Sequence, residues 1–467
     1  MKQPSIVSTA DSYKYSQPSQ YPLDVVSMYD YVEARGGEYS KVVWDGMQYY
    51  VKAYLMNPIT FYDVEKASRK AEKHGEPFDY DGWMYIVEKH KGFLPIRVKS
   101  IPEGSVVPTQ IPLSTIESTD KKVFWVAGFV ETLLMKVWYP TTIASKSYAV
   151  RKMLEGYAEK YSDSLDGVAF QYHNFGDRGS SSVESAAIGG MAHLTQFFGT
   201  DNFNCLDFIE DYYDVECAGY SIVASEHSTV TSWGKSYEFN MIEHHLETHK
   251  ARPIIACVLD SYDIYNATRK VTSGEFKRKI ESDDYPTFVM RPDSGDAVEV
   301  VTGMLEICNQ NNVAYTINSK ELKVMKKYRI IYGDGISPAV IAKILDVAIS
   351  MGYAPDNFAF GSGGDLMQNV NRDTCKFAIK CSNVILADGT MREVFKDPIT
   401  DSGKKSKKGR VTTFINKDGD LRVGSLDDET IAGEREFLEV VYDTGVLGKT
   451  YNFDEVRANS RKEYKLC

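Results

Sequence analysis

Short apolar runs recur through the middle of the chain, and their arrangement restricts the fold more than any other feature. Each run ends abruptly in glycine or a polar residue and is followed by a helical stretch. The landmarks Asp260, Arg291, Asp334 and Gly363 are 31, 43 and 29 residues apart, which suits one strand, one loop and one helix per repeat. Apolar strands that alternate with helices predict a parallel sheet buried on both faces. The runs are Gly167–Tyr172, Tyr220–Ala224, Pro253–Leu259, Thr287–Met290, Arg329–Tyr332 and Asn357–Phe360.

We therefore predict an α/β protein in which residues 166–375 form an irregular parallel α/β barrel. Residues 1–165 mix amphipathic helices with short strands, and residues 376–467 return to a charged, strand-and-turn sequence. We expect these two segments to pack together as a second, α+β domain into which the barrel is inserted. Within the first segment the sequence predicts helices over 63–73 and 83–91, a strand over 96–101 and a buried helix over 123–139.

Composition excludes several classes of protein. The 467 residues contain 54 Lys and Arg against 65 Asp and Glu, a formal charge of −11, which argues against broad binding of nucleic acid or anionic lipid. The most membrane-like run, 123–130, is stopped by Glu131 and is far short of the roughly 20 residues that a bilayer requires. Seven cysteines without a CxxC pair, and an N-terminus without a secretory signal, predict a reduced, cytoplasmic protein.

The polar clusters that follow the apolar runs predict one composite site. In parallel sheets and barrels, chemistry gathers at the carboxyl ends of the strands. Two of the clusters, 333–335 (Gly-Asp-Gly) and 361–364 (Gly-Ser-Gly-Gly), would let backbone N–H groups approach phosphate oxygens without a Cβ in the way. Neither matches the Walker or dinucleotide pattern, and glycine also serves tight turns, so the two clusters are either phosphate-binding loops or purely conformational turns.

Charged residues at the same strand ends have several readings. Arg178 and Arg291 could clamp a phosphate or pyrophosphate, or could form ordinary salt bridges with a nearby aspartate. Asp260, Asp293 and Asp334 could bind Mg²⁺, hydrogen-bond sugar hydroxyls or stabilise a cationic transition state. A further carboxylate, Asp201, could equally be a helix cap.

The histidines and aromatics leave alternatives open as well. His227 could contact pyrophosphate or be phosphorylated, or it could be a structural histidine. His245 and His249 have the i, i+4 spacing of a metal pair, but no third ligand is evident. Phe175 could stack on a flat ring or belong to the core. The basic run 404–410 is a solvated loop or a feature that attracts a polyphosphate.

Taken in order, these clusters resemble the nicotinamide phosphoribosyltransferases, a family of type II phosphoribosyltransferases, and the likeness runs from about residue 5 to 460. Single motifs are modest, whereas the ordered set is highly specific. The segments that carry it are Asp11-Ser12-Tyr13-Lys14, Phe175-Gly176-Asp177-Arg178-Gly179, Gly199-Thr200-Asp201, Glu226-His227-Ser228-Thr229, Asp260-Ser261-Tyr262-Asp263, Arg291-Pro292-Asp293-Ser294-Gly295, Gly333-Asp334-Gly335, Phe360-Gly361-Ser362-Gly363-Gly364 and Ser406-Lys407-Lys408-Gly409-Arg410.

The resemblance implies an enzyme of NAD salvage. Its reaction would convert nicotinamide and phosphoribosyl pyrophosphate into nicotinamide mononucleotide and pyrophosphate through an oxocarbenium-like transition state. Mg²⁺ would be a cofactor, with its direct ligands unassigned, and ATP an optional one, coupled through phosphorylation of His227. The family also implies a homodimer with sites at the subunit interface.

Roles for the site residues follow from the same resemblance. Phe175 would stack on nicotinamide, Tyr13 of the other subunit would cover its opposite face, and Asp201 would accept the carboxamide N–H. His227 and Arg291, with Arg178, would bind the diphosphate, Asp293 would meet the ribose hydroxyls, and Asp260 would be a polar member of the pocket; His227, Arg291 and Asp293 are the catalytic candidates. The mononucleotide and its phosphate would be held by Gly333, Asp334, Gly363, Gly364, Arg372, Lys380 and Arg35.

The sequence departs from the family pattern at four of these places. Asp365 stands where a third glycine is familiar, Ala378 where a hydroxyl can be offered, Gly37 where a lysine can follow Arg35, and Asp177 where an aromatic residue can stand. Two rival functions also remain: nicotinate phosphoribosyltransferase, whose substrate carboxylate Asp201 would repel, and a non-catalytic binding protein on the same fold.

Overall fold

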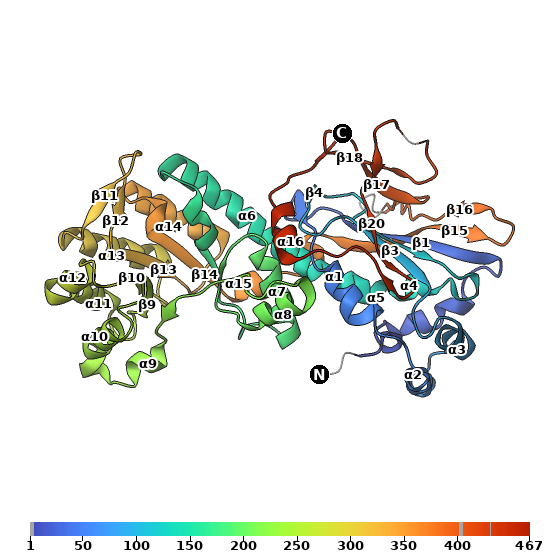
Figure 1. Ribbon diagram of the computed structural model, residues 1–467, viewed down its shortest axis with the longest axis horizontal. Helices are drawn as coiled ribbons and strands as arrows, with labels where there is room; N and C mark the ends of the chain where they lie inside the picture. Colours follow the sequence, from blue (N-terminus) through green and yellow to red (C-terminus); the bar gives the residue numbers. More distant parts are fainter. Residues whose placement is uncertain (1–3, 401–404, 430) are drawn as a thin grey trace. The chain divides into compact units, whose positions relative to one another are not determined.

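The structure is a computed structural model that describes residues 4–400, 405–429 and 431–467. It separates into two compact units, which we call the antiparallel unit and the barrel unit and describe one at a time (Figure 1). The antiparallel unit comprises Met1–Ser145, Ile209–Val215 and Asn371–Cys467, and the barrel unit comprises Lys146–Phe208 and Glu216–Val370.

These limits differ from the predicted domain boundaries at 165/166 and 375/376. The first change of unit, at 145/146, falls inside helix α6 (Trp138–Tyr161). A boundary inside a continuous helix leaves no loop composition for the sequence to reveal. The short return of residues 209–215 to the antiparallel unit falls in helix α8 (Asn204–Tyr213) and the residues after it, and it has no signal in the sequence either.

The barrel unit is built on a seven-stranded parallel sheet in the order β7-β6-β14-β13-β10-β9-β8. An isolated parallel bridge between Gly199 and Tyr220 joins one edge strand to the segment just before the other, so the sheet curls into an irregular barrel. This confirms the predicted fold class. The strands are β6 (Tyr172–Asn174), β7 (Gly199–Thr200), β8 (Val223–Ala224), β9 (Ile254–Val258), β10 (Thr287–Arg291), β13 (Tyr328–Tyr332) and β14 (Phe358–Ser362).

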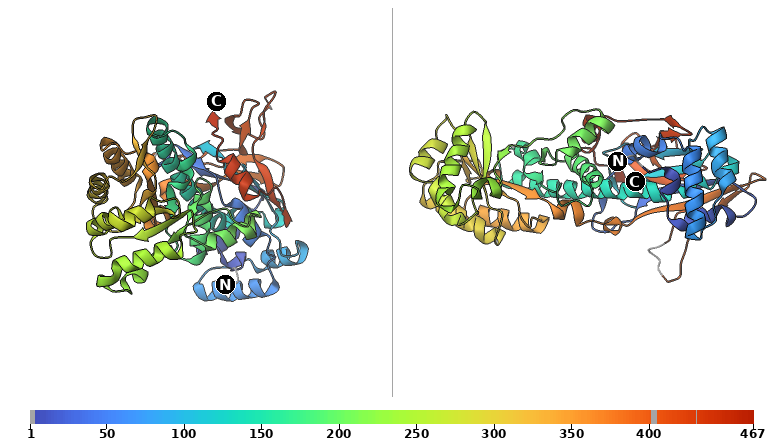
Figure 2. Two further views of the ribbon diagram at one scale, coloured as in Figure 1. Left: turned by 60° about the vertical axis from the view of Figure 1, so that its left-hand side comes forward. Right: turned by 90° about the horizontal axis from the view of Figure 1, so that it is seen from below.

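Helices cover the outside of this sheet (Figures 1 and 2). Within α13 the apolar side chains at 300, 301, 304, 305, 307 and 308 are buried, the period expected of a helix with one face on a sheet. On the face of the sheet opposite these helices, the strand side chains are small or branched, and Ala256, Val289 and Ile331 form one cluster. The helices are α7 (Val183–Leu194), α10 (Glu238–Thr248), α11 (Ile264–Val271), α12 (Gly274–Ile280), α13 (Ala297–Gln310), α14 (Pro338–Ser350) and the short α9 (His227–Thr231) and α15 (Gly364–Gln368).

One predicted strand of the barrel is largely wrong. Most of the run 167–172 forms a 3-10 helix over Asp166–Phe170, and the strand begins only at Tyr172. Within that 3-10 helix Val168 is buried while Phe170 is 47% exposed, so the run does not offer the two buried faces of a central strand.

The antiparallel unit contains a seven-stranded sheet in the order β16-β15-β1-β5-β3-β20-β21. Strand β1 (Val25–Ala34) pairs with β15 (Phe377–Leu386), and β3 (Ile96–Ser100) pairs with β20 (Glu439–Asp443), which confirms that the N- and C-terminal segments build one α+β domain. A four-stranded sheet adds β17 (Val411–Ile415), β18 (Asp420–Ser425), β19 (Arg435–Glu436) and β22 (Lys465–Leu466); the first sheet is completed by β5 (Ser114–Ser118), β16 (Met391–Glu393) and β21 (Val446–Leu447).

Helices of the antiparallel unit follow the sequence prediction at α2 (Phe61–His74) and α3 (Tyr80–Lys89). The single buried helix predicted over 123–139 is wrong: the segment breaks into α4 (Val126–Phe129), α5 (Glu131–Leu134) and a 3-10 turn before α6. Its pieces are short because α4 packs directly on β1 and β5, so the segment follows the sheet. Across the residues that the structure describes, no helix has both the length and the apolar character that crossing a bilayer requires.

Candidate active site

Phe175 lies directly after β6 and packs on glycines from two neighbouring strand ends. A Cβ on Gly361 would come within 1.9 Å of the Phe175 ring, and one on Gly333 within 3.3 Å, so the ring occupies the space that these glycines leave open. The guanidinium carbon of Arg291, the last residue of β10, is 5.2 Å from the ring centroid. The structure therefore brings together four strand ends, those of β6, β10, β13 and β14, whose clusters the sequence placed in one composite site.

A polar network joins the ends of β8, β9 and β10. Nε2 of His227 is 3.0 Å from Oδ1 of Asp260, and Nδ1 is 4.0 Å from Oδ2 of Asp293. The other oxygen of Asp260 accepts hydrogen bonds from the backbone N–H of Asp293 (3.0 Å) and from the hydroxyl of Ser294 (2.5 Å). Because Asp260 is an acceptor on both sides, His227 donates from Nε2, and Nδ1 carries the lone pair in the neutral ring.

The arginine of this network is held by the neighbouring carboxylate. Nη2 of Arg291 lies 3.2 and 3.3 Å from the two oxygens of Asp293, while its Nε is buried without a hydrogen-bond partner. Both side chains are less than one fifth exposed. An unpaired buried guanidinium donor costs free energy, so this arginine has a donor that an anionic ligand would satisfy.

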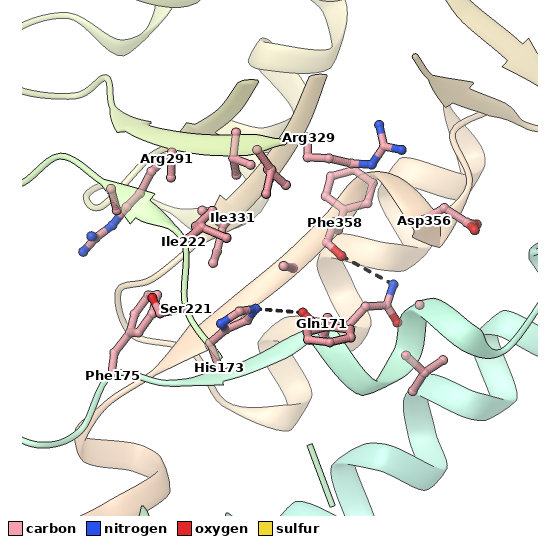
Figure 3. Close-up of a pocket in the computed structure, with 18 of the residues that line it drawn as sticks. Gln171, His173, Phe175, Ser221, Ile222, Arg291, Arg329, Ile331, Asp356 and Phe358 are labelled. Carbon is pink, nitrogen blue, oxygen red and sulfur yellow. Dashed lines mark hydrogen bonds between the residues drawn. The ribbon is translucent and has the colours of Figure 1, made fainter. Parts of the chain in front are cut away.

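Asp201 lies at the mouth of a pocket beside Phe175. Its backbone N–H donates to Asn174, and its Oδ1 accepts a hydrogen bond from the Ser221 hydroxyl at 2.5 Å. His173 lines the same pocket, and Nε2 donates to the carbonyl oxygen of Phe170 at 2.8 Å (Figure 3). Burial lowers the pKa of His173, so its ring stays neutral and does not neutralise the Asp201 carboxylate.

The pocket is a cavity of about 520 Å³ that extends from the strand ends into the barrel. Phe175, Ser221 and Arg291 lie at one end, and Arg329 and Asp356 lie at the other (Figure 3). Barrel interiors are usually filled by side chains. Here the wall residues are small or branched enough to leave a channel; they include Ala224, Ala256, Val289, Ile331 and Ala359.

The glycine-rich loops surround the same strand ends. An added Cβ on Gly333 would lie 3.0 Å from Oδ1 of Asp293, and one on Gly363 would lie 3.4 Å from the carbonyl oxygen of Phe175. Asp334, Gly364 and Arg178 are exposed around this cluster. The hydroxyl of Tyr332 donates to the carbonyls of residues 294 and 295, which ties the loop after β13 to the loop after β10.

Three other predicted site residues, Arg35, Arg372 and Lys380, line a basic pocket of about 750 Å³ in the antiparallel unit. Arg35 is paired with Glu33 at 2.7 Å, and Lys380, whose pKa is lowered by burial, extends from β15. Seven cationic residues line this pocket against three carboxylates, so it suits an anion. The other cationic residues are Lys376, Lys396, Lys405 and Lys407; Lys404 of the basic run lies outside the described residues.

Tyr13, also in the antiparallel unit, is 54% exposed, although the short helix that carries it is firmly held. The neighbouring Lys14 is only 3% exposed, and its ammonium donates to the Gly128 carbonyl (2.8 Å) and pairs with Glu131.

Several alternative readings can now be decided. His245 donates from Nε2 to the carbonyl of Ala256 at 3.1 Å and is buried, so it is a structural histidine. Among the described residues there is no group of three or more His, Cys, Asp or Glu that could hold a metal ion. The backbone explains why position 37 is a glycine where a lysine can stand in the family: its φ is +101°, and a Cβ would lie 2.1 Å from the Thr374 carbonyl oxygen.

Sequence reasoning missed three residues of the cluster. Ser221 and Ser294 orient Asp201 and Asp260, and Lys146 reaches Asp365 beside the glycine loop. Ser294 belongs to the motif 291–295 that the sequence analysis singled out, so its place in the motif could have indicated a role in the site. Ser221 and Lys146 become visible only through tertiary contacts.

Comparison with known proteins fixes the family. Residues 170–459 match the model of the nicotinate phosphoribosyltransferase (NAPRTase) family. The chain belongs to that family. Residues 5–98 also match the nicotinamide phosphoribosyltransferase N-terminal domain, a second match that the sequence-based resemblance predicted.

Relatives within this family align over nearly the whole chain. A nicotinamide phosphoribosyltransferase of Xanthomonas campestris is 43% identical over 462 residues, which cover 98% of both chains. One from Acinetobacter baylyi is 28% identical over 494 residues, covering 97% of this chain and 96% of the relative.

Solved structures share the fold at low identity. Nicotinate-nucleotide pyrophosphorylase from Pyrococcus furiosus superposes with a TM-score of 0.61 at 12% identity, covering 97% of this chain and 94% of the other. Human nicotinic acid phosphoribosyltransferase superposes with a TM-score of 0.58 at 13% identity, covering 97% and 92%.

Proposed function

We propose that this protein is a nicotinamide phosphoribosyltransferase of NAD salvage. It transfers the phosphoribosyl group of phosphoribosyl pyrophosphate to nicotinamide, which yields nicotinamide mononucleotide and pyrophosphate. Family membership, the match over residues 5–98 and the names of the relatives support this assignment. The observation that carries the choice of substrate is the Asp201 carboxylate beside Phe175 at the pocket mouth, because it accepts a carboxamide N–H and repels a carboxylate.

The transfer needs orientation and charge stabilisation rather than a protein nucleophile. The bond from the anomeric carbon to the pyrophosphate oxygen breaks, the pyridine nitrogen supplies the electron pair of the new bond, and pyrophosphate leaves with its electrons. We assign Phe175 to stack on the pyridine ring, so that its nitrogen is held in line with the bond that breaks. Asp201 fixes the ring's rotation through the carboxamide.

We assign stabilisation of the departing negative charge to Arg291, Arg178 and His227. Arg291 offers the unpartnered Nε described above, His227 lies within 4.0 Å of Asp293, and the exposed Arg178 adds a second guanidinium. We assign Asp293 to the ribose hydroxyls, and Asp260 to the support of the His227 ring rather than to direct contact. In the barrel unit, we assign the glycine-rich loops to the mononucleotide, through Gly333, Asp334, Gly363 and Gly364. In the antiparallel unit, we assign Arg35, Arg372 and Lys380 to the same product.

Mg²⁺ belongs to this proposal as a partner of the diphosphate. Because the described residues contain no three-ligand metal group, a protein-only cage is not available there. Mg²⁺ usually retains waters and binds substrate phosphates with one or two carboxylates, and Asp293 and Asp334 provide such carboxylates. When bound, it would neutralise part of the diphosphate charge.

ATP is proposed as an optional co-substrate that phosphorylates His227. With Nε2–H donating to Asp260, the lone pair of Nδ1 can attack the terminal phosphorus, whose bond to the bridging oxygen breaks as ADP leaves. The supporting observation is that His227 keeps 41% of its side chain exposed although its orientation is fixed by a buried carboxylate.

We further propose a cytoplasmic homodimer in which Tyr13 of one subunit covers the pyridine ring bound by its partner. The exposure of Tyr13 on a fixed support favours a role in such an interface. All seven cysteines are unpaired, in keeping with a reducing compartment.

A comparison of substrates tests the proposed function. Purified protein with Mg²⁺ and phosphoribosyl pyrophosphate is given nicotinamide or nicotinate, with and without ATP, and both mononucleotide and pyrophosphate are measured. We expect turnover of nicotinamide to exceed that of nicotinate by at least about 100-fold in kcat/KM. Equal turnover of nicotinate would assign the protein to its rival substrate, and no pyrophosphate from well-folded protein would favour a non-catalytic binding protein.

A further inference from the structure

A buried lysine lies beside the glycine-rich loop of the barrel unit. Lys146, on α6, is only 5% exposed. Its ammonium donates to the backbone carbonyl oxygen of Asp365 at 2.6 Å and lies 2.8 Å from Oδ2 of the same residue. Burying an ammonium group is costly unless it is paired, so Lys146 needs Asp365 for the barrel unit to be stable.

Asp365 follows directly on Gly363 and Gly364 as the second residue of α15. Its Oδ1 accepts a hydrogen bond from the side-chain amide of Asn369 at 3.0 Å, so both carboxylate oxygens have a neighbour. Burial, with a small contribution from the charge of Asp365, raises the pKa of the Tyr172 phenol. The Asp365 carboxylate therefore interacts electrostatically with a buried phenol of β6.

Ser362 is held by its hydroxyl, which donates to the Ile336 carbonyl at 3.2 Å, but Gly363 and Gly364 carry no side chains that could fix them. Gly364 has open space where a Cβ would be, and Gly363 approaches the Phe175 backbone. A backbone of this kind is free to adopt many conformations unless its neighbours hold it. The bond from Lys146 to the Asp365 carbonyl and the ion pair to its carboxylate are two restraints from another element on the residue that ends the glycine run.

We propose that Lys146 and Asp365 are a positioning pair for the phosphate-binding loop. Lys146 fixes the backbone of residues 363–365 and cancels the Asp365 charge, which would otherwise repel the phosphate groups of the substrate. This inference rests on the proposed function, since it assumes that the loop meets a phosphoribosyl phosphate. It also explains how this chain accommodates an aspartate at the end of a glycine-rich loop.

Removal of one charge at a time distinguishes this role from a merely structural one. Lys146→Met leaves an uncompensated carboxylate, and we expect the KM for phosphoribosyl pyrophosphate to rise about 10-fold or more, with the KM for nicotinamide changed less than about twofold. Asp365→Asn leaves an unpaired cation near the phosphate, so this KM should stay level or fall. The double variant Lys146→Met/Asp365→Asn should return to within about threefold of the unmodified protein.

Lys152→Met is the matched control, because Lys152 lies on the same helix and is half exposed; both KM values should stay unchanged. Binding of inorganic pyrophosphate is measured by calorimetry alongside, and it needs no turnover. A protein that binds pyrophosphate but forms no mononucleotide would refute the proposed function and leave the pair testable.

Two results would overturn the pair's role. One is an equal change of both KM values in Lys146→Met. The other is a rise of about 10-fold or more in the KM for phosphoribosyl pyrophosphate in Asp365→Asn, which also decides the case where Lys146→Met does not fold.

Discussion

At the scale of single residues, the pocket combines a negative charge with a flat apolar ring. Asp201 keeps its charge uncompensated because the adjacent His173 is neutral, and its orientation is set by the hydroxyl of Ser221. A carboxylate that accepts an amide N–H contributes more than a neutral acceptor would. Under the proposed function, substrate choice therefore rests on Asp201, with Ser221 orienting its carboxylate and the neutral His173 beside it.

Asp201→Asn is expected to impair nicotinamide use selectively. The loss of a charged acceptor corresponds to about 1.5 to 3 kcal/mol, or roughly 10- to 150-fold in kcat/KM for nicotinamide. The KM for phosphoribosyl pyrophosphate should change little. Steady-state kinetics with each substrate varied will show the split. Ser221→Ala retains the charge and serves as the control, with an effect below about fivefold; equal losses for both substrates in Asp201→Asn would contradict the assignment.

His227→Ala is expected to abolish stimulation by ATP while reduced basal transfer remains. The reason is that the proposed phosphoryl acceptor is removed, whereas Arg291, another proposed diphosphate ligand, is retained. The measurements are mononucleotide formation with and without ATP and acid-labile phosphate on the protein. Asp260→Asn keeps the imidazole but weakens its orienting bond of 3.0 Å, so stimulation should be partial. Full ATP stimulation in His227→Ala would refute the phosphohistidine role.

Sequence reasoning identified the types of residue in this cluster well but not their contacts. His227, Asp260, Arg291 and Asp293 follow successive strands, and parallel topology brings such strand ends together. The partner relations depend on side-chain directions across different loops. Neither periodicity nor spacing could show that Ser221 orients Asp201.

At the scale of elements, Phe175 packs on two glycines, Gly333 directly after β13 and Gly361 within the last two residues of β14. The ring occupies the volume that a side chain at position 361 would take. Strand ends without Cβ atoms thus leave room for the aromatic ring that follows β6 to pack against two neighbouring strands. This close packing holds the proposed stacking surface rigid.

Gly361→Ala is expected to displace the Phe175 ring, because the added Cβ would come within 1.9 Å of it. Overpacking of this kind costs about 1 to 3 kcal/mol of unfolding free energy, and the KM for nicotinamide should rise about 10-fold or more. Denaturant unfolding and kinetics check both effects. Gly156→Ala in α6 has open space at its Cβ and should not lower stability. Unchanged nicotinamide kinetics in Gly361→Ala would show that the ring does not orient the substrate.

At the scale of the whole molecule, buried carboxyl groups in the antiparallel unit link stability to pH. Burial, with the nearby Glu131 adding to it, raises the pKa of Asp30 to about 7. The pKa of aspartate in an unfolded chain is about 3.9. Between the unfolded and the folded pKa, the folded state therefore binds more protons than the unfolded state. The contribution of Asp30 is fully present below the lower value and is lost as the pH rises through the upper one.

Asp30→Asn is expected to remove this pH dependence. Between about pH 4 and 7 one such group lowers the unfolding free energy by up to about 1.4 kcal/mol per pH unit. Urea unfolding at several pH values will compare the slopes. The control is Asp24→Asn, an exposed residue just before the same strand, which should keep the original slope. An unaltered slope in Asp30→Asn would show that Asp30 is already ionised in the folded protein.

The proposed dimer predicts that two impaired variants regain activity when they form mixed dimers. Tyr13→Ala and Asp201→Asn are each expected to retain no more than about a tenth of the kcat/KM for nicotinamide. After unfolding and refolding of an equal mixture, half of the dimers should be mixed and should carry one intact site, so about a quarter of the original activity should return. Sedimentation measures the assembly state. No recovery in a mixture that contains mixed dimers would show that Tyr13 does not act across the interface.

The alternation of strands and helices, the strand-end loops and the resemblance to a family could be predicted from the sequence alone, because apolar periodicity and ordered motifs are local properties of the chain. Tertiary structure decided what local pattern cannot encode. The long segment 123–139 breaks up as it follows a sheet, Asp365 is neutralised by a lysine 219 residues away, and His173 remains neutral because it is buried. Charge state and register between distant segments depend on burial and contact, and these exist only once the chain has folded.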